Sequence, residues 1–313
     1  MAITALRGMK PFSQLMFSAF VILVCFLVFM IISLIVAVPL FGLDSMMSLP
    51  TISDLNNPES IRIMKYLQIV QSFGLFIIPP IILGWLFHGK VNDYLHLNKT
   101  INSTSLFLIL TLTLAAAPFI NFIGEMNMKM SLPEWLSGVE QWMKNAEEKA
   151  AELTEAFLKT RNIFGLLFNL FMIALLPAIG EELLFRGVIQ RIFTNMAKSH
   201  HWGIWISAIL FSALHLQFYG FIPRMLLGVM FGYLLVWSGS MWLPMAAHFL
   251  NNAFAVIAMF MVDKNMLNPK VEEFGSNSLP LAALSLVLIL VIMWLIKNQQ
   301  KINELKYPPS NSD

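Results

Sequence analysis

The sequence predicts an all-α fold: a polytopic integral membrane helical bundle with about eight transmembrane helices. The first observation is composition, because 58% of the 313 residues are hydrophobic and only 12% are charged, whereas soluble proteins carry roughly a quarter charged residues. The second is the length of the uncharged runs, several of which reach the roughly 20 residues that a helix needs to cross a bilayer. Only helices and closed barrels satisfy the backbone in lipid, and these runs are too long for barrel strands.

Three of these runs come before the first long polar stretch, and we expect them to form the membrane helices of an N-terminal region, residues 1–125. The first is much longer than the roughly 7 to 15 apolar residues of a cleavable signal, which predicts a retained helix. The second contains Pro79 and Pro80, which lack backbone donors and should kink the helix. The runs are Pro11–Leu43, Tyr66–Gly89 and Thr100–Gly124.

The polar stretch that follows, residues 126–161, is expected to be an extramembrane amphipathic helix. Between Glu125 and Arg161 it carries five Lys/Arg and seven Asp/Glu. Ser131-Leu132-Pro133-Glu134 has the form of a capping box with proline in the first turn, and apolar residues then recur at helical spacing as far as Phe157. This pattern favours one long helix on the membrane surface or across the end of the bundle. A lid that controls substrate entry is the alternative.

Five further runs follow, and they divide the rest of the chain into a core at residues 162–262 and a last span with a polar tail at 263–313. After the fourth run, Leu183–Ala197 either continues that helix or lies along the interface. The runs are Asn162–Gly180, Trp202–Leu216, Phe221–Trp237, Trp242–Val262 and Leu279–Ile296.

Charge and cysteine usage exclude other classes. The net charge of +2 is small and the basic residues are scattered, so no nucleic-acid partner is expected. Cys25 is the single cysteine and cannot form an intrachain disulfide. Lys and Arg are evenly divided between the two sides, which leaves the positive-inside rule without a preference. An even number of spans places both termini on one side, and their five Lys/Arg favour the inner side.

Three polar motifs at helical spacing lie in the later spans. A charged side chain near the bilayer centre costs roughly 2.5 to 3.5 kcal/mol, so such residues are functional candidates by default. Each has an ordinary structural explanation: the glutamate pair as an interfacial cap, and a lone histidine as a group bonded to a nearby carbonyl. The motifs are Glu181-Glu182-x-x-x-Arg186, Phe211-x-x-x-His215 and His248-x-x-x-Asn252.

Their co-occurrence within about seventy residues favours a shared site. Helical rise places Glu181, His215 and His248 at depths from which all three can line one cavity, which we expect to open toward the side of the termini. Gly228-x-x-x-Gly232 and Ala246-Ala247 supply small residues that allow neighbouring helices to approach closely.

Taken in this order in a membrane protein, the three motifs resemble the CPBP family. These are the intramembrane endopeptidases of CAAX and bacteriocin processing, also called Abi or type II CAAX proteases. The resemblance covers roughly residues 162–262, about a third of the chain, and every motif residue is present. It implies an endopeptidase that hydrolyses a peptide bond in a membrane-associated peptide or lipoprotein.

The resemblance also implies a role for each residue. Glu181 would be the general base that activates water, and His215 would hold and polarise that water. His248 and Asn252 would donate hydrogen bonds to the oxyanion. The supporting roles are an ion pair that positions Glu181, made by Glu182 and Arg186, and packing behind His215, provided by Phe211.

Three alternatives remain open. Glu181, His215 and His248 could bind a catalytic Zn²⁺, although HExxH is absent and we favour a mechanism without a cofactor. Buried carboxylates and histidines also occur in ion-coupled transporters, but the halves show no matching broken segments. The third alternative is a catalytically silent scaffold or immunity factor. In each case we expect an integral protein of the bacterial plasma (inner) membrane.

Overall fold

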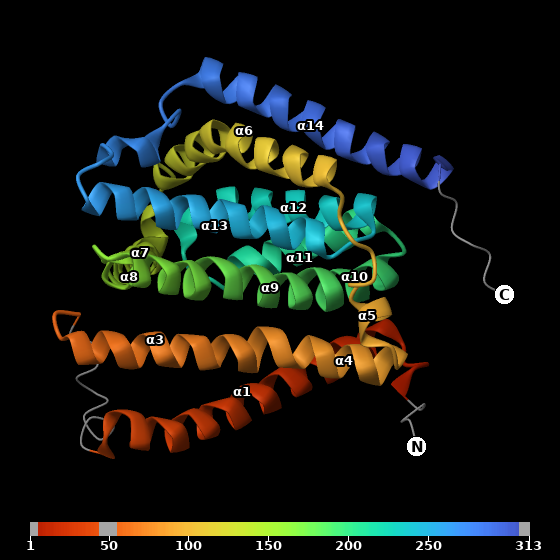
Figure 1. Cartoon of the computed structure of the whole chain (residues 1–313), viewed down its shortest axis with the longest axis horizontal. Coiled ribbons are helices and arrows are strands. Elements are labelled where there is room, and N and C mark those ends of the chain that lie inside the picture. Colours follow the sequence, from red (N-terminus) through yellow and green to blue (C-terminus); the bar gives the residue numbers. More distant parts are fainter. Residues whose placement is uncertain (1–5, 44–54, 307–313) are drawn as a thin grey trace.

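The computed structural model describes residues 6–43 and 55–306, which form helices and no strand. The helices run roughly parallel or antiparallel and are stacked in layers (Figure 1). This arrangement confirms the predicted class, a polytopic helical bundle. The division into regions at residues 125, 161 and 262 stays a prediction, and residues 307–313 of the expected polar tail lie outside the described part.

The first layer consists of α1 (Pro11–Phe41) and a long helix of three parts: α3 (Pro58–Ser72), η3 (Phe73–Ile77) and α4 (Ile78–His88). The η3 segment is π-helical and lies directly before Pro79 and Pro80. A π turn is one way in which a helix accommodates missing backbone donors. The distortion expected at the two prolines therefore takes the form of a π turn, after which the short α5 (Val91–Tyr94) leads away.

The middle layer begins with a continuous helical segment, Ile163–Ala197, of 35 residues. Leu183–Ala197 thus continues the fourth span, the first of the two arrangements that the sequence left open. Two π-helical parts interrupt the segment, and both lie next to the part that carries the glutamates. The parts are α8 (Ile163–Asn169), η5 (Leu170–Leu175), α9 (Leu176–Glu182), η6 (Leu183–Ile189) and α10 (Gln190–Ala197).

The number of spans differs from the expected eight. Seven helices in the described ranges are long and apolar enough to cross a membrane. The expected fifth span, Trp202–Leu216, is instead α11 (His200–Ala213), whose 14 residues extend roughly 21 Å, less than a hydrocarbon core of about 30 Å. After η7 (Phe218–Gly220), α12 (Phe221–Ser238) and α13 (Trp242–Asp263) complete the middle layer.

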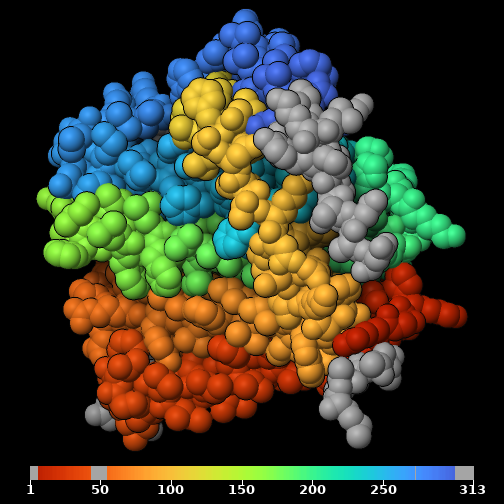
Figure 2. All heavy atoms as spheres, turned by 45° about the vertical axis from the view of Figure 1, so that its right-hand side comes forward, coloured from red at the N-terminus to blue at the C-terminus, as the bar shows by residue number. Residues whose placement is uncertain are grey.

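The last layer is formed by α6 (Ser103–Met128) and α14 (Leu279–Lys306), with η8 (Pro269–Glu273) before α14. Figure 2 shows the same stacking from another side, with the middle layer between α1, α3 and α4 on one flank and α6 and α14 on the other. In Figure 1, α1 begins and α14 ends at the same end of the bundle. The short α11 still reverses the chain direction, which is why the two ends share a side.

The helix expected at residues 126–161 is α7 (Ser137–Leu158), which is shorter than expected and is preceded by the 3₁₀ turn η4 (Glu134–Leu136). The predicted capping box at Ser131 is wrong, because the helix begins later and the Leu132 N–H donates to Oε2 of Glu140, at 3.2 Å. A hydrogen bond from Lys144, joined by the bond from Leu132, lowers the pKa of Glu140. The Glu140 side chain thus holds the segment before the helix in place, and no cap forms at Ser131.

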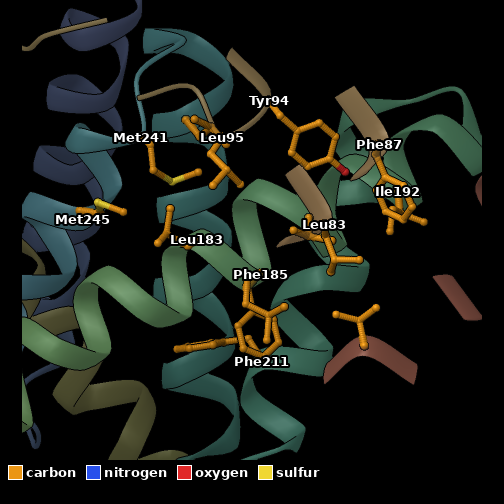
Figure 3. Packing of buried hydrophobic residues seen from close by; sticks show 14 of the residues in the cluster. Leu83, Phe87, Tyr94, Leu95, Leu183, Phe185, Ile192, Phe211, Met241 and Met245 are labelled. Atoms are coloured by element: carbon orange, nitrogen blue, oxygen red, sulfur yellow. The ribbon is translucent and has the colours of Figure 1, made fainter. Parts of the chain in front are cut away.

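The largest apolar core lies between the first and middle layers. Leu83 of α4, Leu95 after α5 and Phe185 of η6 are almost completely buried, and Figure 3 shows them meeting Phe211 of α11 and Met241. Phe185 and Phe211 meet edge to face, with ring centroids 5.2 Å apart. This contact fixes α11 against the helix that carries the glutamates.

Candidate active site

Two adjacent glutamates end α9, and their side chains have different surroundings. Successive helical residues are rotated by about 100°, so the neighbours cannot face the same way. Glu182 is completely buried, whereas Glu181 lines a cavity. The two carboxylates are therefore suited to different tasks.

Glu182 is held in a buried ion pair. Its Oε2 lies 3.0 Å from Nε of Arg186, with side chains 0% and 1% exposed. The guanidinium also donates from Nη2 to the Gly228 carbonyl, at 3.2 Å, and its centre lies 4.7 Å from the Phe211 ring and 5.5 Å from the Phe231 ring. Removing one member of a buried pair leaves an uncompensated charge, so the loss of either residue is expected to destabilise this region.

The glycines of the small-residue motif are what admit this arrangement. A Cβ at Gly228 would lie 3.1 Å from Cβ of Ala208, and one at Gly232 would lie 2.7 Å from Oε1 of Gln190. The exposed carbonyls accept from Arg186 and, at Gly232, from Nε2 of Gln190 at 3.4 Å. The motif therefore supports the ion pair in addition to allowing close helix packing.

His248 joins the two glutamates. Its Nδ1 lies 2.8 Å from Oε1 of Glu182, and its Nε2 lies 3.8 Å from Oε2 of Glu181. The ring stacks on Phe231 at 5.1 Å and meets Phe211 edge to face at 6.0 Å. Glu182 and the two aromatic rings fix the orientation of the imidazole, so Nε2 is directed toward Glu181.

His215 follows α11 in the turn that leads to η7, and the residue is exposed. Its Nδ1 lies 2.8 Å from the Phe211 carbonyl. A carbonyl can only accept, so Nδ1 carries a proton, and in the neutral ring Nε2 keeps its lone pair. The ring packs edge to face on Phe211 at 5.0 Å, as expected from the spacing of the motif.

Asn252 lies one turn beyond His248 on α13. Its Nδ2 donates to the Ile173 carbonyl of η5 at 3.3 Å, and its Oδ1 accepts from Nδ2 of Asn251 at 3.2 Å. A primary amide has two N–H donors, so one N–H of Nδ2 remains after the bond to Ile173.

Glu181, His215, His248 and Asn252 all line one cavity of about 480 Å³. A second cavity, of about 280 Å³, is also lined by Glu181 and His215. Residues of α7, including Phe157, also line the larger cavity. In Figure 1, α7 lies at the end of the bundle opposite the chain ends. The cavity therefore extends toward the end of the bundle opposite the termini, where α7 lines it, and the expected opening toward the side of the termini stays a prediction.

A three-ligand zinc site does not fit this arrangement. The bond from His248 to Glu182 is of a kind that orients metal-bound histidines. Within residues 6–43 and 55–306, however, no three His, Cys, Asp or Glu side chains are grouped so that they could hold one ion. Glu181, His215 and His248 share a cavity without converging on a point.

Several polar residues at this site were missed from the sequence. Gln190 follows Arg186 by four residues, just as Arg186 follows Glu182, and Arg224 is a charged residue inside the apolar run Phe221–Trp237. Both could therefore have been recognised from the sequence. Arg224 and Asn251 line the larger cavity. The role of the Ile173 carbonyl could not be recognised in this way, because the identity of an apolar side chain says nothing about what its backbone carbonyl accepts.

The fold and this site define a class: a polytopic membrane protein whose central helices bring carboxylates, imidazoles and a guanidinium together in and around a cavity. Residues 163–254, which include all of these groups, match the family described as type II CAAX prenyl endopeptidase Rce1-like. The predicted resemblance is thereby confirmed for this part of the chain.

A curated relative is the uncharacterized protein YpbD of Bacillus subtilis (strain 168), which is 33% identical over 89 residues. The alignment covers 27% of this chain and 42% of that protein, so the chain spans less than half of the relative that it matches. No solved structure matches the chain.

Proposed function

We propose that this protein is an intramembrane endopeptidase that hydrolyses a peptide bond in a membrane-associated protein or peptide with water activated by Glu181. The observation that carries the proposal is the asymmetry of the glutamates. Glu182 is committed to Arg186 and His248 at 3.0 and 2.8 Å, whereas Glu181 faces a cavity within an endopeptidase-family segment. A carboxylate at a cavity wall, whose His248 partner lies as far away as 3.8 Å, is the group that can take a proton from water.

The first step is attack by water. The Glu181 carboxylate takes one proton while the water oxygen bonds to the substrate carbonyl carbon. In the neutral ring of His215, Nδ1–H donates to the Phe211 carbonyl, and Nε2 accepts a hydrogen bond from the remaining O–H. His215 thereby holds the water in line with the carbonyl.

The second step stabilises the tetrahedral oxyanion and releases the amine. The remaining Nδ2 hydrogen of Asn252 donates to the oxyanion, and so does Nε2–H of His248 when its ring carries both protons, with Nδ1–H on Glu182. Glu181 then gives its proton to the leaving nitrogen as the carbon–nitrogen bond breaks. The products are a carboxylic acid and an amine, and Glu181 is an anion again.

The site in the cell is proposed to be a bacterial plasma membrane. The support is the seven apolar helices and the likeness of part of the chain to a Bacillus subtilis protein. The substrate class follows the same reasoning: a cavity among membrane helices is reached most readily by peptides that are themselves bound to the membrane.

The test is cleavage of a peptide and lipopeptide library by the detergent-purified protein, followed by mass spectrometry and compared with Glu181→Gln. We expect cleavage by the wild type and a loss of at least about a hundredfold in the variant, because general-base catalysis contributes roughly 10²- to 10⁴-fold. Cleavage that persists in Glu181→Gln would refute the assignment of the base. Proton-linked solute flux in vesicles, without any cleavage, would refute the proposal that the protein is an endopeptidase.

A further inference from the structure

Arg224 is a second cation beside the candidate site, and the proposed hydrolysis does not use it. It lies in the first turns of α12 and lines the same cavity as Glu181 and His215. Arg186, in contrast, does not line that cavity and has Glu182 as its partner. The two arginines therefore differ as the two glutamates do: one is committed and one faces the cavity.

The hydrogen bonds of Arg224 are to a neutral residue. Nη1 and Nη2 donate to the carbonyl and side-chain oxygens of Gln217. Glu147 of α7 also lies at this end and uses its Oε2 to accept the Tyr219 N–H at 3.2 Å. Among the described residues, no carboxylate lies within ion-pair distance of Arg224, as Glu182 does of Arg186.

A guanidinium has five N–H donors in a planar fork that matches a carboxylate. Two groups of donors are turned to Gln217, and the remaining N–H groups have the geometry to bind an anion. A cation in a membrane segment is costly when it is unpaired. Glu147 and Glu181 act on Arg224 electrostatically from beyond ion-pair distance. A ligand carboxylate in the cavity would give the guanidinium a direct partner in addition to this longer-range attraction.

We propose that Arg224 binds a carboxylate of the substrate and so selects peptides that carry one near the scissile bond. The inference rests on the proposed function and makes Arg224 a specificity-determining residue. Because Glu181 and Arg224 line one cavity, a peptide can place its scissile bond at the first and its carboxylate at the second. The carboxylate comes either from the C-terminus of the peptide or from an Asp or Glu side chain.

The experiment uses three matched forms of one apolar peptide: a free C-terminal acid, the C-terminal amide, and the amide with one internal Asp. Binding of fluorescent versions to full-length Glu181→Gln protein in detergent is measured by anisotropy, with and without the added change Arg224→Gln. Arg224→Lys tests retention of charge without the fork. Arg62→Gln, which alters an exposed arginine on α3 outside the cavity, is the control.

We expect the acid or the Asp form to bind about tenfold to a hundredfold more tightly than the plain amide, in line with a charged hydrogen bond. Arg224→Gln should remove this difference, Arg224→Lys should keep part of it, and Arg62→Gln should leave it unchanged. Preference for the free acid identifies the chain end as the source, and preference for the Asp form identifies the side chain.

Two results would overturn the proposal. Equal binding of all three forms by protein with an intact Arg224 would do so even if Arg224→Gln did not fold. In protein that retains Glu181, a uniform fall in kcat for every cleaved form on Arg224→Gln would mark the arginine as a counter-charge or oxyanion donor. Because binding is measured without turnover, a wild type that cleaves no peptide refutes the protease and leaves this test intact.

Discussion

At the scale of single residues, the site depends on how two neighbouring carboxylates are divided between structure and chemistry. The two carboxylate oxygens of Glu182 contact Arg186 and His248. One oxygen of Glu181 lies 3.8 Å from Nε2 of His248 at the cavity wall. Both charges of the ion pair are buried, so the cost of removing them from water can offset their attraction. The large energetic effect is the destabilisation expected when one partner is removed.

Glu182→Gln is expected to destabilise the protein far more than Glu181→Gln. The amide can still accept from His248, but Arg186 is left as an unpaired buried cation, at a cost of about 3 to 5 kcal/mol. Thermal unfolding of the two detergent-purified variants measures the difference. Glu148→Gln, an exposed change on α7, should leave the melting temperature unchanged. Equal losses at positions 181 and 182 would contradict the division of roles.

At the scale of elements, the fit between α12 and its neighbours depends on Gly228 and Gly232. A side chain at Gly232 would meet Cγ2 of Ile204 at 2.8 Å as well as the Gln190 amide. Ile204 is completely buried and branched at Cβ, so it cannot turn away without disturbing α11.

Gly232→Ala is therefore expected to lower stability by about 1 to 3 kcal/mol through overpacking. Gly124→Ala on α6 is the matched control, because its added Cβ would meet nothing closer than Cγ of Pro223 at 3.9 Å and alanine favours the helix. Unfolding curves of the two variants measure the contrast. A Gly232→Ala protein as stable as Gly124→Ala would show that the helices separate at little cost.

The limits of sequence reasoning are clear at this same scale. Residue types and spacing were sufficient for the bundle, for the ion pair of Glu182 with Arg186 and for the contact of Phe211 with His215, because helical periodicity determines neighbours at i+4. Periodicity does not show which helices pack together, so the link between Glu182 and His248, 66 residues apart, could not be predicted. Nor does it reveal that α11 is too short to span.

At the scale of the whole molecule, the family segment lies between two flanking layers that the motifs do not mark. Its cavity is lined partly by α7 from outside that segment. Lys65 of α3 donates to the Phe157 carbonyl at 2.7 Å and to Oδ1 of Asn169 at 3.2 Å, which ties the end of α7 to the first and middle layers. The flanking helices thus help to close the site.

The proposed chemistry needs no metal, so treatment with a strong chelator is expected to leave cleavage by the purified protein unchanged. The physical reason is that one carboxylate and positioned imidazole and amide groups supply base, water contact and oxyanion donors. Initial rates before and after treatment, together with elemental analysis of the purified protein, provide the measurement. Loss of activity that added zinc restores would overturn a metal-free mechanism.

The π-helical segments on both sides of α9 have a consequence for how this chain tolerates insertions and deletions. A π turn contains one residue more than the α-helical turn it replaces, and each residue rotates the following helix by about 100°. Deleting one residue from η5 (Leu170–Leu175) would shorten the segment very little, but it would swing the two glutamates around the axis relative to α8. Glu182 would lose its facing histidine while every motif letter remained in place. In this protein the angular phase of one helix is therefore as much a part of the site as the identity of its side chains.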